Sequence, residues 1–278
     1  MQDAFAYCAE LVRAADHDRF IAALFAASER RAALNALYAF NVEVARVREA
    51  AHAALPGEIR LQWWSDVVSR RRDEEAGANP VAAALLTTME RHNLKASPLL
   101  DLIEARRFDL YEDPMASVAD LETYTRRTSS SLFALAAQIL ADVDAPAVAE
   151  PAGIAYGIAA ILRALPVHIA RRQLYLPIEL LDRHQVTMAD LFAGRPAAGL
   201  AAAVAELRDL ARSRLRILRE RLELLPLSAV PAFLPVALVA PSLAKTARGD
   251  PLAPGEIAPW RRQWLIWRAA RNPARIAG

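Results

Sequence analysis

The residues of this sequence whose type and spacing most clearly indicate a binding site are three arginines, Arg163, Arg171 and Arg172. A guanidinium group binds diphosphate or carboxylate oxygens with two parallel hydrogen bonds, so this group predicts an anion-binding site. The same residues could instead form ion pairs at the end of a helix. The acids available for such pairs are Glu43, Glu49 and Asp182. The sequence leaves both interpretations open.

A metal site is not expected from the histidines or the cysteine. His168 follows Pro166 closely, and no second histidine or cysteine stands at ligand spacing from it. A structural role is therefore the expectation for His168. Cys8 is the one cysteine in the chain, so no internal disulfide is expected and a reducing compartment is indicated.

The C-terminal stretch 255–278 combines tryptophan with arginine and contains one acid, Glu256, before Trp260. A helix with this composition is typical of a membrane interface or of a surface that docks on a partner. Alternatively, the tryptophans pack on the rest of the protein while the arginines face water. The residues in question are Trp260, Arg261, Arg262, Trp264, Trp267 and Arg268.

Helices are expected to position all of these residues. The 278 residues include only nine glycines and are rich in alanine, leucine and arginine, a composition that favours helices. Apolar residues recur every three or four positions over 200–225, and no stretch alternates as a strand would. Pro166 predicts a bend or an end in the helix that precedes it. We expect a single all-α domain over residues 1–278.

Charge and hydropathy exclude some classes of function. The formal net charge of +2 gives no overall attraction for nucleic acid. The longest apolar stretch, 225–244, contains four prolines and therefore fits a membrane-spanning helix poorly. The first ten residues lack the pattern of a secretory signal. A cytoplasmic protein, in solution or peripheral on the inner face of the membrane, is the expectation.

Five stretches resemble the squalene/phytoene synthase family in their order and spacing, best over residues 20–191. They are 31–40 (RAALNALYAF), 61–67 (LQWWSDV), 79–85 (NPVAAAL), 102–110 (LIEARRFDL) and 161–177 (ILRALPVHIARRQLYLP). The resemblance implies a class I isoprenoid synthase fold, an all-α bundle around one central cavity. It also makes Tyr38 and Tyr124, which lie in or near these stretches, candidates for ligand binding together with the three arginines.

The family's reaction requires Mg²⁺, because a prenyl diphosphate loses its diphosphate only when the departing charge is neutralised. The resemblance implies two acidic motifs that hold the metal. At the corresponding positions this chain has Ala45, Arg46 and Glu49 in the first motif, and Ala160, Ala164 and His168 in the second. Only Glu49 could supply a carboxylate, so neither a catalytic residue nor a bound metal is expected.

The pattern is similar to a non-catalytic subgroup of that family, the phytoene-synthase-like assembly factors of respiratory complex I. The similar stretches are 37–43, 62–64, 130–132 and 161–172. The leading hypothesis is therefore an assembly or scaffolding factor that contacts a subunit of a respiratory membrane complex. One alternative is an active head-to-head prenyltransferase, which would need Mg²⁺. Another is a carrier that holds an isoprenoid in the cavity.

Overall fold

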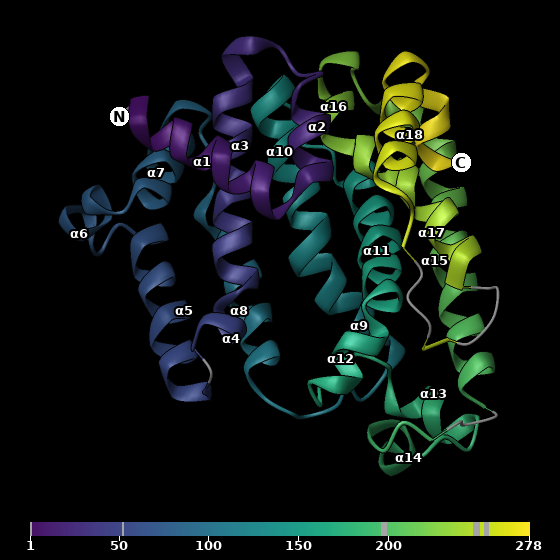
Figure 1. Cartoon of the computed structure of the whole chain (residues 1–278). Helices are drawn as coiled ribbons and strands as arrows, with labels where there is room; N and C mark the ends of the chain where they lie inside the picture. The colour runs from purple at the N-terminus through teal and green to yellow at the C-terminus, as the bar shows by residue number, and fades with distance from the viewer. Residues whose placement is uncertain (1, 52, 196–198, 247–250, 253–255) are drawn as a thin grey trace.

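The computed structural model describes residues 2–51, 53–195, 199–246, 251–252 and 256–278. Within these ranges the chain forms helices, turns and loops, and no strand occurs. The expected all-α fold is therefore confirmed. Figure 1 shows the longer helices standing side by side, with short helices closing both ends of the bundle.

The α-helices of the first half are α1 (Gln2–Ala15), α2 (His17–Ala23), α3 (Ser28–Ala45), α4 (Val47–Ala51), α5 (Ala54–Val68), α6 (Asp73–Ala78), α7 (Pro80–Arg91), α8 (Ala96–Arg106) and α9 (Val118–Thr125). Those of the second half are α10 (Ser131–Ala141), α11 (Pro146–Arg163), α12 (Leu165–Ala170), α13 (Ile178–Arg183), α14 (Met188–Phe192), α15 (Leu200–Arg221), α16 (Val230–Phe233), α17 (Val239–Thr246) and α18 (Pro259–Arg271). Short 3₁₀ or π turns connect some of them: η1 (Arg107–Leu110), η2 (Arg126–Ser130), η3 (Leu222–Leu224), η4 (Leu227–Ala229), η5 (Leu234–Leu238) and η6 (Pro273–Ala277).

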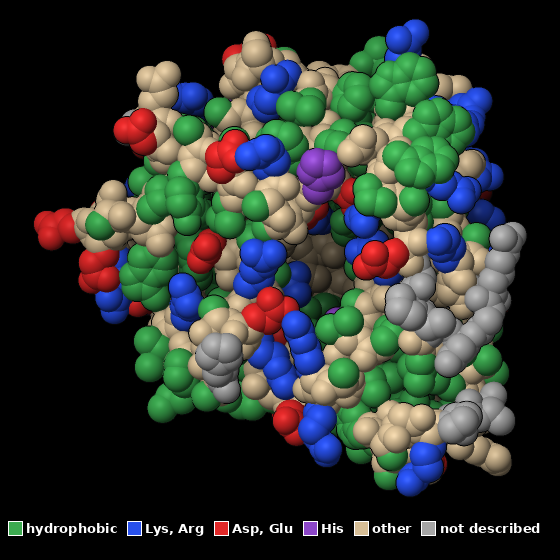
Figure 2. Space-filling view, in the orientation of Figure 1, with side chains coloured by type: hydrophobic (Ala, Val, Ile, Leu, Met, Phe, Trp, Pro, Cys, Tyr) green, Lys and Arg blue, Asp and Glu red, His purple; other side chains and the backbone are tan. Residues whose placement is uncertain are grey.

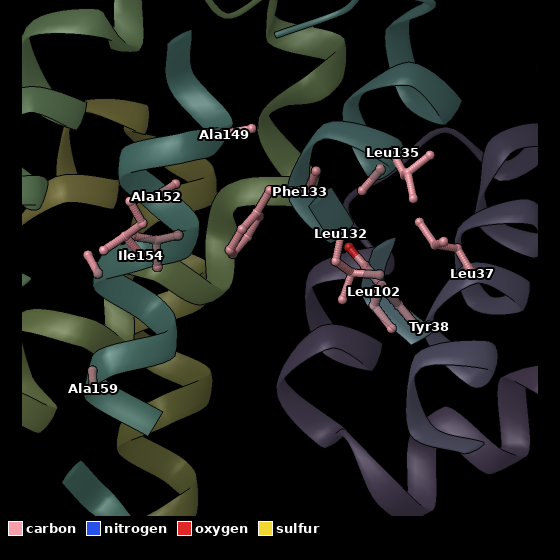
Figure 3. Packing of buried hydrophobic residues seen from close by; sticks show 14 of the residues in the cluster. Leu37, Tyr38, Leu102, Leu132, Phe133, Leu135, Ala149, Ala152, Ile154 and Ala159 are labelled. Carbon is pink, nitrogen blue, oxygen red and sulfur yellow. The ribbon is translucent and has the colours of Figure 1, made fainter. Parts of the chain in front are cut away.

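Helix α3 is the most deeply buried helix of the first half, and α1, α7 and α10 pack around it. Its apolar residues occupy several faces, so it has no single solvent-facing side. Leu37 and Tyr38 of α3 lie near Leu102 of α8 and Leu132 and Leu135 of α10 (Figure 3). This contact joins the two halves of the core and fixes α8, which carries a central residue of the site.

The helical stretch from Val118 to Ala141 contains a widened turn. Helix α9 runs into the π turn η2, and α10 continues from it. The Thr128 hydroxyl donates to the Tyr124 carbonyl at 2.7 Å, and the Ser130 hydroxyl donates to the Glu150 carbonyl at 3.0 Å. These bonds provide partners for hydroxyls that would otherwise compete with the helix backbone. The turn lies directly against α11.

Helix α11 ends before Pro166, as the sequence predicts. Ala164 is the residue between α11 and α12, and Pro166 occupies the first turn of α12, where its missing N–H breaks no helical bond. The chain changes direction at this point. The arginines that follow Pro166 therefore leave the axis of α11.

The segment Leu227–Thr246 is long and apolar enough to cross a membrane, judged by length and composition alone. However, 72% of its most apolar window is buried inside the protein, and 3₁₀ turns interrupt it at η4 and η5. Phe233 in this segment stacks on Phe133 of α10 with ring centroids 5.3 Å apart. The segment is therefore part of the core. Buried helices of folded domains can be as long and apolar as membrane-spanning ones.

Close contact between α11 and η2 leaves no room for a side chain at Gly153. A Cβ atom on Gly153 would lie 2.3 Å from the Ser130 backbone, whereas a Cβ atom on Gly77 of α6 would meet nothing within 4 Å. We expect Gly153→Ala to lower the free energy of unfolding by about 1–3 kcal/mol, because the two backbones must move apart. Gly77→Ala, the control, should leave it unchanged or raise it by up to about 1 kcal/mol. Equal urea midpoints for the two variants would contradict this packing.

Candidate functional site

Two adjoining cavities occupy the middle of the bundle, and Arg106 of α8 lines both. The α12 cavity has a volume of about 700 Å³ and is lined by Ala45, Arg48, Glu49, Arg106, Asp109, Ala164, Val167, His168, Arg171, Gln173 and Tyr175. The α2 cavity has a volume of about 510 Å³, and its lining includes Asp16, Asp18, Arg19, Asn41, Tyr156, Ala160, Arg163, Pro259 and Arg262. Figure 2 shows a hollow in the middle of this face with charged side chains on its rim.

The floor of the α12 cavity is a buried network centred on the Asp109 carboxylate. Its Oδ1 atom accepts hydrogen bonds from the hydroxyls of Tyr124, at 2.8 Å, and Tyr175, at 2.7 Å. Its Oδ2 atom accepts from Arg106 Nη1 at 3.1 Å, and the same nitrogen donates to the Tyr124 hydroxyl at 2.8 Å. Gln173 completes the network by donating to the Tyr175 hydroxyl at 3.1 Å.

The charges of this network are fixed by mutual contact. Burial alone would lower the pKa of the Arg106 guanidinium, but Tyr124, Asp109 and Tyr175 outweigh this effect and raise the pKa. Burial also raises the pKa of both tyrosines above their usual range. Arg106 therefore stays cationic and the tyrosines stay neutral donors. Within this network, the Nε atom of Arg106 is buried without a hydrogen-bond partner among the described residues.

The rim of the α12 cavity is closed by two further arginines. Arg171 Nη1 donates to Glu49 Oε1 at 2.5 Å, and both side chains are about half exposed. Arg48 donates to the carbonyls of Asp109, at 2.8 Å, and Tyr111, at 3.1 Å. Of the acids considered as partners for the three arginines, Glu49 therefore forms an ion pair with Arg171. Arg48 thus connects α4 to η1, the 3₁₀ turn that carries Asp109.

His168 lies against the network as a neutral ring. Its ring centroid is 4.6 Å from that of Tyr175, and its Nδ1 atom is buried without a partner in the described part of the chain. Burial lowers the pKa of His168 to about 4, and the charge of Arg171 acts in the same direction. The imidazole is therefore uncharged near neutral pH and does not add a positive charge to the cavity.

The α2 cavity has its own set of paired charges. Asp16 caps α2 by accepting from the backbone of Arg19, and its carboxylate also pairs with the Arg19 guanidinium at 2.5 Å. The Arg19 guanidinium lies over the rings of Tyr38 and Tyr156. Asp18 pairs with Arg262 of α18, which joins the two ends of the chain. Both carboxylates of this cavity wall are therefore occupied by arginines.

The cavities bring together some of the predicted site residues. Those that line the α12 cavity are Ala45, Glu49, Ala164, His168 and Arg171, and those that line the α2 cavity are Ala160, Arg163 and Arg262. Four of the predicted motif and ligand residues lie outside both linings, as do Trp260, Arg261, Trp264, Trp267 and Arg268 of α18. Arg46 is exposed, Arg172 pairs with Glu112 at 3.7 Å, and Tyr38 and Tyr124 are buried beside the cavities.

Sequence reasoning missed the residues at the centre of the site, Arg106, Asp109 and Tyr175. All three lie inside stretches that carry the family resemblance, 102–110 and 161–177. Arg106 and Asp109 are three residues apart, a spacing that brings side chains together on helical turns. That spacing could have been used to predict that Arg106 and Asp109 form a pair. Arg262 was expected only as a surface residue of α18, but it turns inward to Asp18.

The residues present do not fit a magnesium cluster. The α12 cavity offers two carboxylates, Glu49 and Asp109, and each is paired with an arginine. Among the residues that the structure describes, no group of three or more His, Cys, Asp or Glu side chains is placed to hold a metal ion. Binding of Mg²⁺ in this cavity would require both acid–arginine pairs to separate. It would also require further oxygen ligands, which the lining does not supply.

Comparison with known proteins identifies the fold. The sequence model of the squalene/phytoene synthase family matches residues 12–268. The chain belongs to the squalene/phytoene synthase family. The match confirms the predicted resemblance and extends it through most of the C-terminal third. A dehydrosqualene synthase crystal structure superposes with a TM-score of 0.82 at 18% identity, covering 97% of this chain and 96% of that one.

Within the family, the chain is more similar to assembly factors than to a phytoene synthase. It is 33% identical over 250 residues to the NADH dehydrogenase (ubiquinone) complex I assembly factor 6 of Rattus norvegicus, covering 89% of this chain and 75% of the relative. It is 23% identical over 211 residues to the 15-cis-phytoene synthase of Synechocystis, covering 70% of this chain and 61% of that relative.

The two acid–arginine contacts of the α12 cavity should differ sharply in their effect on stability. Asp109→Ala leaves the buried Arg106 without its carboxylate, so we expect the free energy of unfolding to fall by about 3–5 kcal/mol. Glu49→Ala breaks a half-exposed pair and should cost about 1 kcal/mol or less. Urea unfolding of the two variants measures both effects. Similar losses for both would show that Asp109 does not organise a buried network.

Proposed function

We propose that this protein is a non-catalytic member of its family that assists assembly of a respiratory membrane complex of the complex I type. The observation that carries the proposal is the state of the carboxylates in the central cavities. Glu49, Asp109, Asp16 and Asp18 are each paired with an arginine. A site whose acids are neutralised by the protein's own cations has no free ligands for the metal that the family's reaction needs.

The sequence at the two expected metal motifs supports the same proposal. Ala45 and Ala164 face the α12 cavity, and Ala160 faces the α2 cavity. An alanine cannot coordinate Mg²⁺, and Glu49 alone cannot build a cluster that takes its ligands chiefly from carboxylates. We infer that the Asp-rich motifs are lost in this chain and that no Mg²⁺ cofactor is used. The prenyltransferase alternative would require ligands that the cavities do not supply.

The relatives support the choice of assembly as the role. The rat protein that shares 33% identity with this chain is named as a complex I assembly factor. The alignment with that protein covers 89% of this chain, so a surface shared by the two would serve a comparable partner. We therefore propose a subunit or assembly intermediate of a respiratory complex as the partner. A location in the cytoplasm or on the inner face of the membrane follows from that partner.

The carrier alternative is less favoured by the lining of the cavities. An isoprenoid chain is apolar, and apolar ligands occupy pockets lined mainly by hydrophobic and aromatic side chains. The α12 cavity presents Arg48, Arg106 and Arg171 instead. Burying a hydrocarbon chain against these groups would remove water from charges without replacing its hydrogen bonds.

The proposal is tested by deletion and complementation in the source organism. Deleting the gene should lower the amount of fully assembled NADH dehydrogenase complex on native gels and lower NADH:quinone activity in membranes. The wild-type gene should restore both. Glu49→Gln should restore them equally, because this residue contributes only a half-exposed ion pair.

Two outcomes would contradict this role. A deletion strain with normal levels of the assembled complex would exclude a required assembly function. Failure of Glu49→Gln to complement, with normal protein abundance, would indicate that the carboxylate acts as a ligand or a catalyst. Immunoblotting of the complemented strains provides the abundance control.

A further inference from the structure

The outer face of α18 carries an unusual row of exposed tryptophans. Trp260, Trp264 and Trp267 are 69%, 44% and 49% exposed. Their spacing of four and three residues places them on one side of the helix, at about 100° per residue. On the opposite side, Ile266 and Ala269 are buried in the bundle. Of the two alternatives for this helix, the one in which the tryptophans are covered by the protein is therefore disfavoured.

The helix itself is firmly attached, so the tryptophans are held outward. Arg262 pairs with Asp18 of α2, and α18 packs against η5, α2 and η6. Figure 1 shows α18 along the outer edge of the bundle, and Figure 2 shows hydrophobic and basic side chains gathered over that region. A rigid helix that presents three indoles to water indicates an interaction surface, because contiguous exposed apolar groups are uncommon on monomeric proteins.

Basic residues accompany the tryptophans without acidic counterparts. The sequence from 257 to 278 contains five arginines and no aspartate or glutamate. The Arg268 guanidinium lies 4.3 Å from the Trp264 ring centroid, and that of Arg271 lies 5.7 Å from the Trp267 ring centroid. Within the described ranges, Arg261, Arg268 and Arg271 form no ion pair in this chain. Their charges are therefore available to an external anion.

This combination distinguishes a lipid surface from a general protein-binding face. Indole rings favour the headgroup region of a bilayer, where the ring is shielded from water and its N–H keeps a hydrogen-bond partner. Arginines beside them meet lipid phosphates, and stacking on the rings holds the guanidinium groups at the same level. The exposed side of α5 has Leu55 and Ile59 but no such tryptophan–arginine pairs.

We propose that the Trp260–Trp264–Trp267 face of α18 docks on an anionic phospholipid bilayer. The helix has 13 residues, fewer than the roughly 20 needed to cross a bilayer, so it lies in the plane of the interface. The tryptophans enter the headgroup region, and Arg261, Arg268 and Arg271 bind phosphate oxygens. This docking is independent of the function proposed above, since a scaffold and an enzyme could use it equally.

The test is co-sedimentation of the full chain with vesicles of phosphatidylcholine alone or mixed with phosphatidylglycerol. The parent should bind the anionic vesicles, and higher salt should weaken binding by screening the arginines. Trp260→Ala/Trp264→Ala/Trp267→Ala should lower the partition coefficient about tenfold or more. Arg261→Gln/Arg268→Gln/Arg271→Gln should remove the preference for anionic lipid.

Leu55→Ala/Ile59→Ala is the matched control, because it removes two side chains that are 71% and 64% exposed on α5. This variant should bind like the parent. Circular dichroism and thermal midpoints establish that all variants are folded. Equal binding by the parent and the tryptophan variant would overturn the proposal, as would absence of parent binding or an equal loss in the α5 control.

A second readout uses the parent alone and does not depend on how the variants fold. Three of the five tryptophans of the chain are on this face, so insertion should shift the fluorescence emission to shorter wavelength. Phospholipids brominated in their acyl chains should quench it. Unchanged emission with anionic vesicles would contradict lipid docking and would leave an acidic protein surface as the alternative occupant.

Discussion

The buried Asp109 carboxylate is the constraint on which the centre of this protein depends. It holds the cationic Arg106 and the hydroxyls of Tyr124 and Tyr175 at hydrogen-bond distance. These groups come from α8, α9 and the loop after α12, so one carboxylate ties three separate segments together. A buried charge is tolerated only when it is paired and fully hydrogen-bonded. The geometry of the cavity floor therefore follows from satisfying this single charge.

The same constraint determines what the cavity can do. Asp109 already accepts three hydrogen bonds, and Glu49 pairs with Arg171 at the rim. In the family's reaction, carboxylates bind Mg²⁺ and the metal neutralises diphosphate. In this chain arginines pair with the carboxylates, and the α12 cavity is lined by three arginines and two acids. Such pairs hold the surrounding helices together, whereas a metal site needs ligands that are free to coordinate.

Much of the fold could be predicted from the sequence. Helical periodicity, scarce glycine and the five family stretches predicted the all-α bundle, and Pro166 predicted the end of α11. The π turn at 126–130 was not predicted, because helical periodicity does not reveal a single widened turn or the close packing of Gly153 of α11 against its Ser130. The Asp109 network was missed because Tyr124 and Tyr175, which donate to Asp109, are distant from it in sequence. The outward tryptophans of α18 could not be assigned because composition alone does not reveal which face of a helix is covered.

Turnover with prenyl diphosphates shows most directly whether the cavity carboxylates can hold a catalytic metal. The purified protein is incubated with farnesyl or geranylgeranyl diphosphate, Mg²⁺ and a reductant, and released diphosphate is measured beside an active dehydrosqualene synthase. If the cavity carboxylates are held by arginines, release should not exceed the protein-free blank. Release that EDTA abolishes and that Glu49→Gln removes would contradict the account, because it would show that Glu49 leaves Arg171 to bind a catalytic metal.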